Sequence, residues 1–285
     1  MKDKTVLVTG ASQGIGKYTA LALAAQGARV AIVARNVERG TAALQEISRA
    51  SGSEKIELFV ADLSSLAEVR RLAAEFKARH SRLDVLVNNA GLLLPTRCVT
   101  VDGVEETFAV NHVAPFVLTA ELSELLQASP PARVVTVSSE AHRLTKMRWD
   151  DLQGARERYS PYRTYGQSKL ANILFTFALA RRFAGKGVTA NCLHPGLVAS
   201  NFGHTYKLTA FLMRLTRPFL STPPEGARTS IHLASSPAVD GVTGEYFVDS
   251  QPRRSSAASR DVAAQERLWT LTEELVGNVV RRQAS

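Results

Sequence analysis

Tyr165 and Lys169 stand four positions apart at the start of an apolar run, residues 170–183, which predicts a buried helix. On a helix, side chains at this spacing lie on one face with Cβ atoms about 5–6 Å apart. A phenol, with its usual pKa of about 10, is a poor acid or base at neutral pH, but a nearby ammonium lowers that pKa. The pair could therefore transfer a proton, although most such pairs are solvated helix edges and other motifs must support the chemistry.

A glycine-rich turn follows the first predicted strand. Residues 5–9 are a β-branched run that predicts a buried strand, and residues 17–25 are an alanine-rich helical pattern. Glycines between a strand and a helix let the backbone approach a pyrophosphate, and the helix N-terminus supplies free N–H groups. The spacing Gly-x-x-x-Gly-x-Gly favours a dinucleotide site, with an ordinary tight turn as the alternative. The predicted cofactor-binding residues of this turn are Gly10, Ser12, Gln13, Gly14, Ile15 and Gly16.

The end of the second predicted strand, residues 28–34, bears on the choice of nucleotide. A site for NAD(H) usually has Asp or Glu there to bind the ribose 2′-hydroxyl. This chain has Ala34 followed by Arg35, and a guanidinium without a neighbouring carboxylate suits a 2′-phosphate. The sequence therefore predicts NADP(H), with NADPH preferred over NADH. The alternative is that Arg35 is a solvated turn residue.

Strands and helices continue to alternate after this point. Residues 56–61 and 83–87 predict the third and fourth strands, with a helix over residues 66–80 between them. Asp62, followed by Leu63, could accept a hydrogen bond from an adenine amino group or could cap that helix. The alternation predicts an α/β fold with a doubly wound parallel sheet.

Three motifs stand in register along the chain. They are Thr-Gly-Ala-Ser-Gln-Gly-Ile-Gly at residues 9–16, Asn-Asn-Ala-Gly at residues 88–91, and Tyr165-x-x-x-Lys169. Together they resemble the short-chain dehydrogenase/reductase family over nearly the whole sequence. The resemblance implies an NADP-dependent oxidoreductase built as a single Rossmann-type domain, residues 1–285, with about seven strands and helices on both faces of the sheet. The cofactor contacts that it implies in the last two motifs are Asn89, Ala90, Gly91, Tyr165 and Lys169.

The resemblance also implies roles in hydride transfer. Tyr165 exchanges a proton with the substrate oxygen, while Lys169 lowers the pKa of Tyr165 and holds the nicotinamide ribose. Ser139, at the end of a strand predicted over residues 133–139, hydrogen-bonds the same substrate oxygen. Ser138 is the runner-up for this role, and a serine pair that only caps the strand end is the alternative.

Asn111 lies in a long helix predicted over residues 104–126, which Pro115 could kink. Inside a helix, Asn is a neutral or mildly unfavourable residue. The resemblance implies that Asn111 holds a water near the catalytic Lys and links it to solvent. The alternative is that the side chain fills a kink in its own helix, and both readings can hold.

A Pro-Gly pair leaves the sixth predicted strand, residues 188–193. The resemblance implies that this stretch meets the nicotinamide carboxamide, with Ser where the family often has Thr. The residues concerned are Pro195, Gly196, Val198 and Ser200.

Residues 201–224 stand where the family carries a lid over its substrate. An apolar stretch at residues 208–215 suggests a lipophilic or aromatic carbonyl or alcohol as substrate. The rival reading is an amphipathic patch over residues 207–220 that makes weak contact with a membrane surface or a partner. The long insert between Ser139 and Tyr165, the glycine-rich turn, the Ala34-Arg35 strand end and residues 168–172 resemble the retinol dehydrogenase-like branch. This implies a carbonyl reductase or a retinol dehydrogenase-like enzyme.

Composition argues against several function classes. Lys and Arg number 35 against 26 Asp and Glu, a net charge of +9, but the basic residues are scattered and we expect no nucleic-acid partner. The 2 cysteines and 6 histidines show no metal-ligand spacing, so no metal site is predicted. The sequence has no signal-peptide pattern and no apolar run of membrane-spanning length, which predicts a soluble, cytoplasmic protein.

The last part of the chain predicts a helix over residues 225–235, a seventh strand over residues 244–249 and a C-terminal helix within residues 260–285. The Ser/Ala-rich residues 254–259 are expected to be mobile. The resemblance implies a homodimer or homotetramer that pairs the helices bearing the catalytic Asn and Tyr. The alternative function is a non-catalytic NADP(H)-binding sensor or scaffold.

Overall fold

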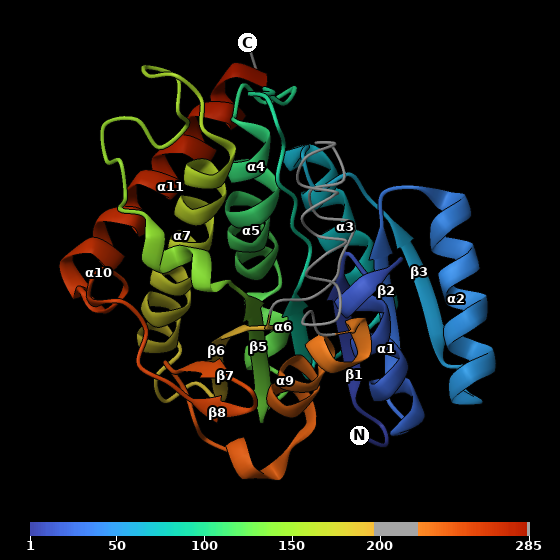
Figure 1. Cartoon of the computed structure of the whole chain (residues 1–285). Coiled ribbons are helices and arrows are strands. Elements are labelled where there is room, and N and C mark those ends of the chain that lie inside the picture. Colours follow the sequence, from blue (N-terminus) through green and yellow to red (C-terminus); the bar gives the residue numbers. More distant parts are fainter. Residues whose placement is uncertain (197–221, 284–285) are drawn as a thin grey trace.

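Eight strands form one sheet across the residues that this computed structural model describes, 1–196 and 222–283 (Figure 1). Their order is β3-β2-β1-β4-β5-β6-β7-β8; β1 to β7 pair in parallel, and β8 pairs antiparallel with β7. The strands are β1 (Thr5–Thr9), β2 (Arg29–Ala34), β3 (Ile56–Val60), β4 (Val85–Asn88), β5 (Ala132–Val137), β6 (Val188–His194), β7 (Tyr246–Val248) and β8 (Gln251–Pro252). The predicted Rossmann-type, doubly wound sheet is confirmed, with the short β8 added at its edge.

The order of the strands reverses beside β1. This strand pairs with β2 on one side and with β4 on the other, so the sheet grows outward in both directions from it. In open α/β sheets, ligands bind at the carboxyl ends of the strands where the order reverses. The turn after β1 and the residues after β4 therefore face one crevice.

Helices cover both faces of the sheet. One face carries α1 (Gly14–Ala25), α2 (Val37–Ser51) and α9 (Pro223–Ser235); the other carries α3 (Leu66–Arg79), α5 (Ala114–Glu121) and α7 (Pro161–Arg182) (Figure 1). In β1, Val6 and Val8 pack into the core on the first side and Leu7 into the core on the second, as the alternation of a strand requires. The other helical elements are α4 (Glu106–Phe108), η1 (Ala109–Val113), α6 (Ser123–Gln127), η2 (Glu140–Leu144), η4 (Pro237–Val239), α10 (Ala257–Arg260) and α11 (Val262–Gln283).

The prediction of one continuous helix over residues 104–126 is wrong. The segment is divided into α4, the π-helical turn η1, α5 and α6. Pro115 lies in the first turn of α5, directly after η1. Because proline cannot donate the i→i−4 hydrogen bond, the α-helical ladder is interrupted here, and the wider π turn occupies the break. That turn carries Asn111.

The C-terminal helix α11 packs along α7 and reaches α5 (Figure 1). The ring of Trp269 stacks on Phe175 of α7, with centroids 5.9 Å apart, and meets Phe116 of α5 edge-on at 4.8 Å. Arg182 lies over the same indole, 3.9 Å from its centroid, and pairs with Glu266 at 2.6 Å. The helix is therefore an integral layer over the face that bears α5 and α7.

Residues 254–259, expected to be mobile, form a packed turn that leads into α10. The side chains of Ser255 and Ser259 are buried, and Ser259 Oγ donates to Ser255 Oγ at 2.8 Å. Ser256 caps α10 by accepting a hydrogen bond from the N–H of Ser259. The expectation is wrong because these serines bond to the local backbone and to one another, as serines do at helix caps.

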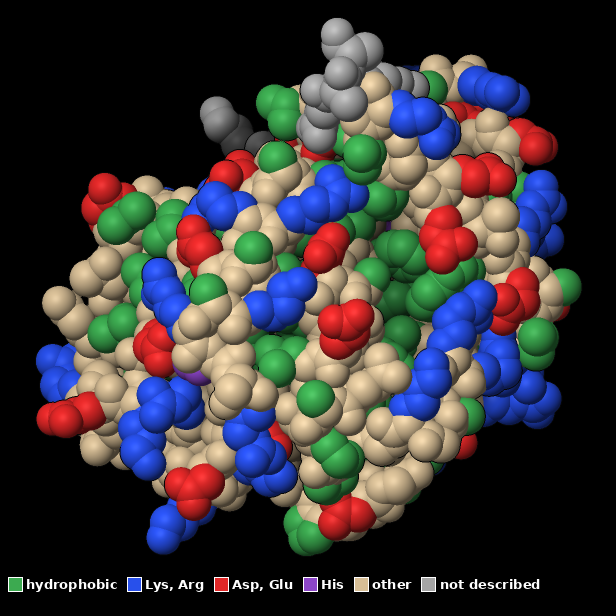
Figure 2. All heavy atoms as spheres, turned by 180° about the vertical axis from the view of Figure 1, so that it is seen from behind, with side chains coloured by type: hydrophobic (Ala, Val, Ile, Leu, Met, Phe, Trp, Pro, Cys, Tyr) green, Lys and Arg blue, Asp and Glu red, His purple; other side chains and the backbone are tan. Residues whose placement is uncertain are grey.

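Lys and Arg side chains are spread over the face shown in Figure 2 and lie among acidic side chains. Several basic side chains of the described residues form ion pairs; Arg71, for example, contacts Glu68 at 2.6 Å and Glu75 at 2.5 Å. The positive net charge is thus distributed over that face. Within residues 1–196 and 222–283, no helix has the length and apolar character needed to cross a membrane.

Replacing Trp269 by Ala should lower the free energy of unfolding by roughly 3 kcal/mol, because the change removes a large ring from two aromatic contacts and leaves a cavity. Urea denaturation followed by circular dichroism measures the effect. The matched control is Thr270→Ala, at an exposed neighbour on α11, which should change stability by less than about 0.5 kcal/mol. Equal, small effects of both substitutions would contradict the packing role of α11.

Candidate active site

The turn between β1 and α1 brings backbone N–H groups to the crevice. Gly10 and Gly14 have φ angles of 65° and 57°, which other residues rarely adopt. A Cβ on Gly16 would lie 2.5 Å from the carbonyl oxygen of Gly10. The N-cap residue of α1, Gln13, makes no side-chain capping bond. The first N–H groups of α1 are therefore left for an anion, which supports the reading of this stretch as a dinucleotide turn.

Asn89 fastens the end of β4 to this turn. Its Nδ2 donates to the carbonyl oxygen of Thr9 at 2.8 Å, and its backbone N–H donates to Thr9 Oγ1 at 3.0 Å. The N–H of Ala90 donates to the same hydroxyl oxygen, also at 3.0 Å. Asn89 and Ala90 border the crevice, and these bonds also join the two strand ends at the place where the sheet order reverses.

Basic side chains stand at the end of β2. Arg35 and Arg39 are both exposed and border the same cavity as the glycine-rich turn. Asn36, between them, caps α2 by accepting from the N–H of Arg39 at 2.8 Å. Arg35 was predicted from the sequence and Arg39 was not, although Arg39 lies in the first turn of the helix that follows directly.

Asp62 and Leu63 follow β3 and also border the cavity. Asp62 Oδ1 accepts from the N–H of Ser64 at 2.9 Å. The next helix, α3, is capped by Ser65, whose Oγ accepts from the N–H of Glu68. The alternative in which Asp62 caps this helix is therefore wrong, because Ser65 holds the N-cap position.

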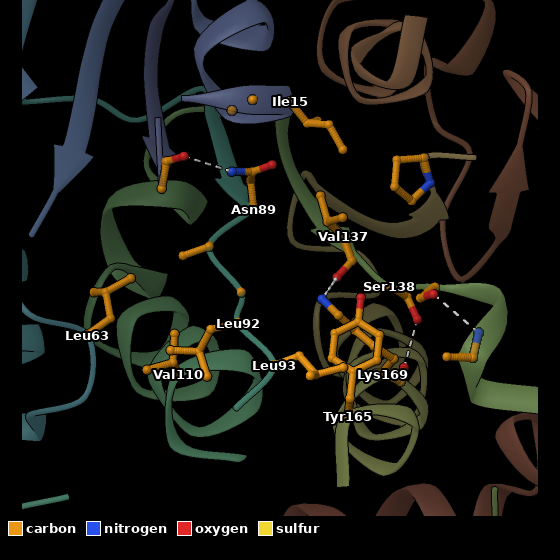
Figure 3. A pocket seen from close by; sticks show the side chains of 18 of the residues that line it. Ile15, Leu63, Asn89, Leu92, Leu93, Val110, Val137, Ser138, Tyr165 and Lys169 are labelled. Atoms are coloured by element: carbon orange, nitrogen blue, oxygen red, sulfur yellow. Dashed lines mark hydrogen bonds between the residues drawn. The ribbon is translucent and has the colours of Figure 1, made fainter. Parts of the chain in front are cut away.

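Tyr165 and Lys169 lie side by side on α7 (Figure 3). Lys169 Nζ is 5.6 Å from the centroid of the Tyr165 ring and donates to the carbonyl oxygen of Val137 at 3.0 Å. Burial lowers the pKa of Lys169 to about 8. Burial raises the pKa of Tyr165 to about 12, and a hydrogen bond with Ser139 opposes this rise. The expectation of a lowered Tyr165 pKa is wrong, because desolvation of the phenolate outweighs the other influences.

The two serines after β5 have different partners. Ser138 Oγ is buried and donates to the carbonyl oxygen of Lys169 at 2.7 Å. Ser139 hydrogen-bonds Tyr165 and, as the N-cap of η2, accepts from the N–H of Ala141 at 3.2 Å. The serine that meets the phenol is therefore Ser139, while Ser138 fastens β5 to α7.

Asn111, on η1, joins two other segments of the chain. Its Oδ1 accepts from the N–H of Leu92 at 2.7 Å, and its Nδ2 donates to Leu92 O and to Ser168 Oγ, each at 2.9 Å. The alternative in which Asn111 fills a kink in its own helix is wrong, since these bonds all reach other segments. A Cβ on Gly91 would lie 3.4 Å from Asn111 Oδ1 and 3.3 Å from Lys169 Nζ, so both polar atoms border the same small space.

A cavity of ≈ 1890 Å³ is bordered by these groups except Asn111, and it exceeds the roughly 300–1,000 Å³ of a site for one drug-sized ligand. The expected site residues that line it are Gly10, Ser12, Gln13, Gly14, Ile15, Gly16, Arg35, Asp62, Leu63, Asn89, Ala90, Gly91, Ser139, Tyr165, Lys169, Pro195 and Gly196. Val198, Ser200 and most of the expected lid, residues 201–224, lie outside the described residues. Lining residues that the sequence reasoning missed include Arg39, Leu92, Leu93, Val110, Val137 and Ala141, most of which are close in sequence to a recognised motif.

The chain matches the family model described as short chain dehydrogenase over residues 4–209. It belongs to the short-chain dehydrogenase family. Retinol dehydrogenase 12 of Mus musculus is 43% identical over 274 residues, covering 96% of this chain and 86% of that protein. Retinol dehydrogenase 14 of Homo sapiens is 41% identical over 294 residues, covering 97% and 87%. The predicted family, with its retinol dehydrogenase-like branch, is confirmed.

Solved structures agree with the family assignment of this short-chain dehydrogenase. An uncharacterised protein from Mycobacterium Paratuberculosis has a TM-score of 0.78 at 34% identity, covering 96% of this chain and 93% of that chain. The Pseudomonas aeruginosa RhlG/NADP active-site complex has a TM-score of 0.68 at 30% identity, covering 87% and 94%. The agreement extends over most of this chain.

Beyond Ser139 and Tyr165, the cavity of this short-chain dehydrogenase is bordered by apolar and basic side chains. The apolar ones include Leu93, Leu144 and Tyr162, and the basic ones are Arg143, Lys146, Arg148 and Arg163. The three arginines are tied to acidic side chains of the same region, Glu140, Asp151 and Glu157. The insert between Ser139 and Tyr165 therefore forms part of the cavity wall.

Gly16→Ala should destabilise the fold by roughly 1–3 kcal/mol, because the new Cβ meets the carbonyl of Gly10 and the side-chain amide of Asn89, and both are held by the turn. Thermal unfolding measures the effect. The matched control is Gly277→Ala in α11, where the Cβ would meet only the end of the Arg281 side chain at 3.7 Å. Better helix propensity should stabilise that variant by about 0.5–1 kcal/mol. Stabilisation by both substitutions would contradict the close packing of the turn.

Proposed function

We propose that this short-chain dehydrogenase transfers hydride between NADP(H) and a lipophilic or aromatic alcohol or carbonyl compound, with Tyr165 as the general acid and base. The observation that carries the proposal is the meeting of Tyr165, Lys169 and Ser139 on one wall of a cavity whose other end holds the glycine-rich turn. A phenol, an ammonium and a hydroxyl in this arrangement can move a proton to and from a bound oxygen.

The residues at the nucleotide end fit a phosphorylated dinucleotide. The N-terminus of α1 offers N–H groups for the pyrophosphate, and a Cβ at Gly14 would point into open space, whereas Gly10 and Gly16 let the turn pack closely against Asn89. Arg35 and Arg39 border the cavity where the ribose 2′-phosphate would lie, and Arg is well suited to that group. The RhlG complex named with NADP, 30% identical, supports the same choice.

The nicotinamide, when bound, supplies the hydride, and this chain's own residues supply the proton and the positions. With its pKa raised to about 12, Tyr165 keeps its proton at neutral pH and can donate it to the substrate oxygen during carbonyl reduction. Ser139, already hydrogen-bonded to the phenol, orients that oxygen. In alcohol oxidation the phenolate is the base, and the same contacts run in reverse.

Lys169 is the group that can return a proton to Tyr165. A pKa of about 8 leaves the amine largely protonated at neutral pH while allowing it to exchange protons near that range. One N–H group of Lys169 donates to Val137 O. The other two can donate to the nicotinamide ribose hydroxyls or pass a proton to Tyr165. Asn111 Oδ1 borders the same space beside Gly91, which fits the proposed role of Asn111 in holding a water there.

A lipophilic substrate is supported by the apolar surface of Leu93, Leu144 and Tyr162 beyond the catalytic groups. The curated relatives at 40–43% identity that are named retinol dehydrogenases support this substrate class. We include both a carbonyl reductase of broad range and a retinol dehydrogenase-like enzyme in the proposal. Turnover separates both from a non-catalytic NADP(H)-binding sensor or scaffold, which would bind NADPH equally well.

A cytoplasmic location and a homodimer or homotetramer stay predictions. The oligomer would pair the helices that carry Asn111 and Tyr165. Because α11 lies on that face, with Trp269 against α5 and α7, a second copy would meet α11 before it met those helices.

Tyr165→Phe should lower kcat by at least about 100-fold, because it removes the proton-transferring hydroxyl and nothing else. NADPH binding should be retained. Steady-state oxidation of NADPH with aldehydes, ketones and retinal measures kcat, and quenching of tryptophan fluorescence measures the Kd for NADPH. Loss of NADPH binding in this variant would mean that Tyr165 is structural, and unchanged kcat would rule out its role as acid.

Arg35→Glu should reduce the preference for NADPH over NADH by about 10-fold or more, because a carboxylate repels a 2′-phosphate and accepts from a free 2′-hydroxyl. The ratio of the Kd values for the two nucleotides measures it without a known substrate. The control is Arg49→Glu, an equal change of charge on the exposed side of α2 away from the cavity. A similar loss of preference in both variants would mean that only the net charge matters.

A further inference from the structure

His142 is a buried histidine that follows the catalytic serine position by three residues. Its side chain is 0% exposed, and it does not border the cavity, although its neighbours Ala141 and Arg143 do. Nδ1 lies 2.7 Å from the carbonyl oxygen of Ser139, and Nε2 accepts from the backbone N–H of Ser256 at 3.2 Å. The imidazole thus bridges the start of η2 and the turn before α10.

These two contacts fix the tautomer of His142. A backbone N–H can only donate, so Nε2 must be the unprotonated nitrogen. The ring proton is then on Nδ1, which donates to the carbonyl oxygen of Ser139. Burial also lowers the pKa of His142, so the imidazole stays neutral and keeps both bonds at neutral pH.

The surroundings of His142 hold the ring in place. Tyr246 of β7 packs edge-on against it, with centroids 5.2 Å apart, and donates its hydroxyl proton to Glu140 at 2.8 Å. Arg143 pairs with Glu140 and donates to the carbonyl oxygen of Arg254 at 2.6 Å. The short helix η2 is therefore tied on both sides to chain that comes more than a hundred residues later.

We propose that His142 is a positioning residue, whose Nδ1–H fixes the carbonyl of Ser139 and thereby aims the Ser139 hydroxyl at Tyr165. The inference rests on the proposed function of this site and adds a residue to it. Ser139 leaves β5 in an extended conformation, with φ of −162°, and its hydroxyl has to reach the phenol while its backbone turns into η2. A hydrogen bond to its carbonyl restrains the peptide that sets this direction, and misplacement by about 1 Å can cost roughly 100-fold in rate.

Three substitutions separate positioning from packing. His142→Phe removes both side-chain bonds and leaves the backbone N–H of residue 142 donating to the carbonyl oxygen of Ser139 at 3.1 Å. His142→Gln can reach Ser256 but offers no donor at the place of Nδ1. His142→Asn can put its amide N–H at the place of Nδ1 and so donate to Ser139. We expect kcat to fall by about 10- to 100-fold in the Phe and Gln variants, with the Kd for NADPH unchanged, and most of that loss to be recovered in the Asn variant.

A double-mutant cycle with Ser139→Ala gives the decisive readout. If His142 acts through Ser139, His142→Phe should cause no further loss of kcat once the Ser139 hydroxyl is gone. The matched control is His80→Phe, at the buried C-cap residue of α3, which does not border the cavity; it should lower the melting temperature but not kcat. Equal losses from His142→Phe with and without the Ser139 hydroxyl, or unchanged kcat in all three variants, would overturn the inference.

The proposed function and the positioning role can fail separately. If the wild-type protein turns over no carbonyl, the proposed function fails, and NMR still tests the role of His142. The nitrogen shifts of its ring should show a proton on Nδ1 only, and the carbonyl-carbon shift of Ser139 should change in the Phe and Gln variants but not in the Asn variant. A proton on Nε2, or a Ser139 carbonyl shift unaffected by all three substitutions, would overturn the positioning role.

Discussion

The candidate site depends on the hydrogen bonds between Thr9, at the end of β1, and Asn89, just after β4. They join the carboxyl ends of β1 and β4, where the sheet order reverses and the crevice opens. The side-chain amide of Asn89 also lies against Gly16 in the first turn of α1. A side chain at that position would clash with the amide, so the start of α1 requires glycine there. The nucleotide turn and the segment that leads past Gly91 toward Lys169 are thus set by one cluster of backbone and amide contacts.

The face of α7 that bears Tyr165 and Lys169 is a second constraint, because it places a buried amine beside a partly buried phenol. Burying an ammonium is costly unless it is bonded, and Lys169 has the carbonyl of Val137 as its bonded acceptor within the described chain. The cost appears as a pKa lowered to about 8 for Lys169 and raised to about 12 for Tyr165. Both pKa shifts leave a protonated phenol beside an amine that can replace its proton. Desolvation disfavours both charged groups, and the same shifts suit the proposed proton transfer.

The features that the sequence predicted correctly are those that local patterns of residues determine. Buried parallel strands, the glycine-rich turn and the spacing of Tyr165 and Lys169 are readable because each is decided within a few residues. The π turn η1, the Ser65 cap and the packed turn around Ser255 were missed or misread, because tertiary contacts or a choice between adjacent polar residues decide them. The direction of the Tyr165 pKa was misread for the same reason: spacing shows which groups are near, but not how much water surrounds them.

The elements η1 and η2, which pack against α7, each contact the C-terminal part of the chain through a buried histidine. On η1, next to Asn111, His112 Nε2 lies 3.0 Å from Thr272 Oγ1 of α11. Burial lowers the pKa of His112 to about 3, which keeps that ring neutral. On η2, His142 makes the corresponding bridge to the turn before α10. The C-terminal segment thus contacts the elements on both sides of α7, although it carries none of the motifs that define the family.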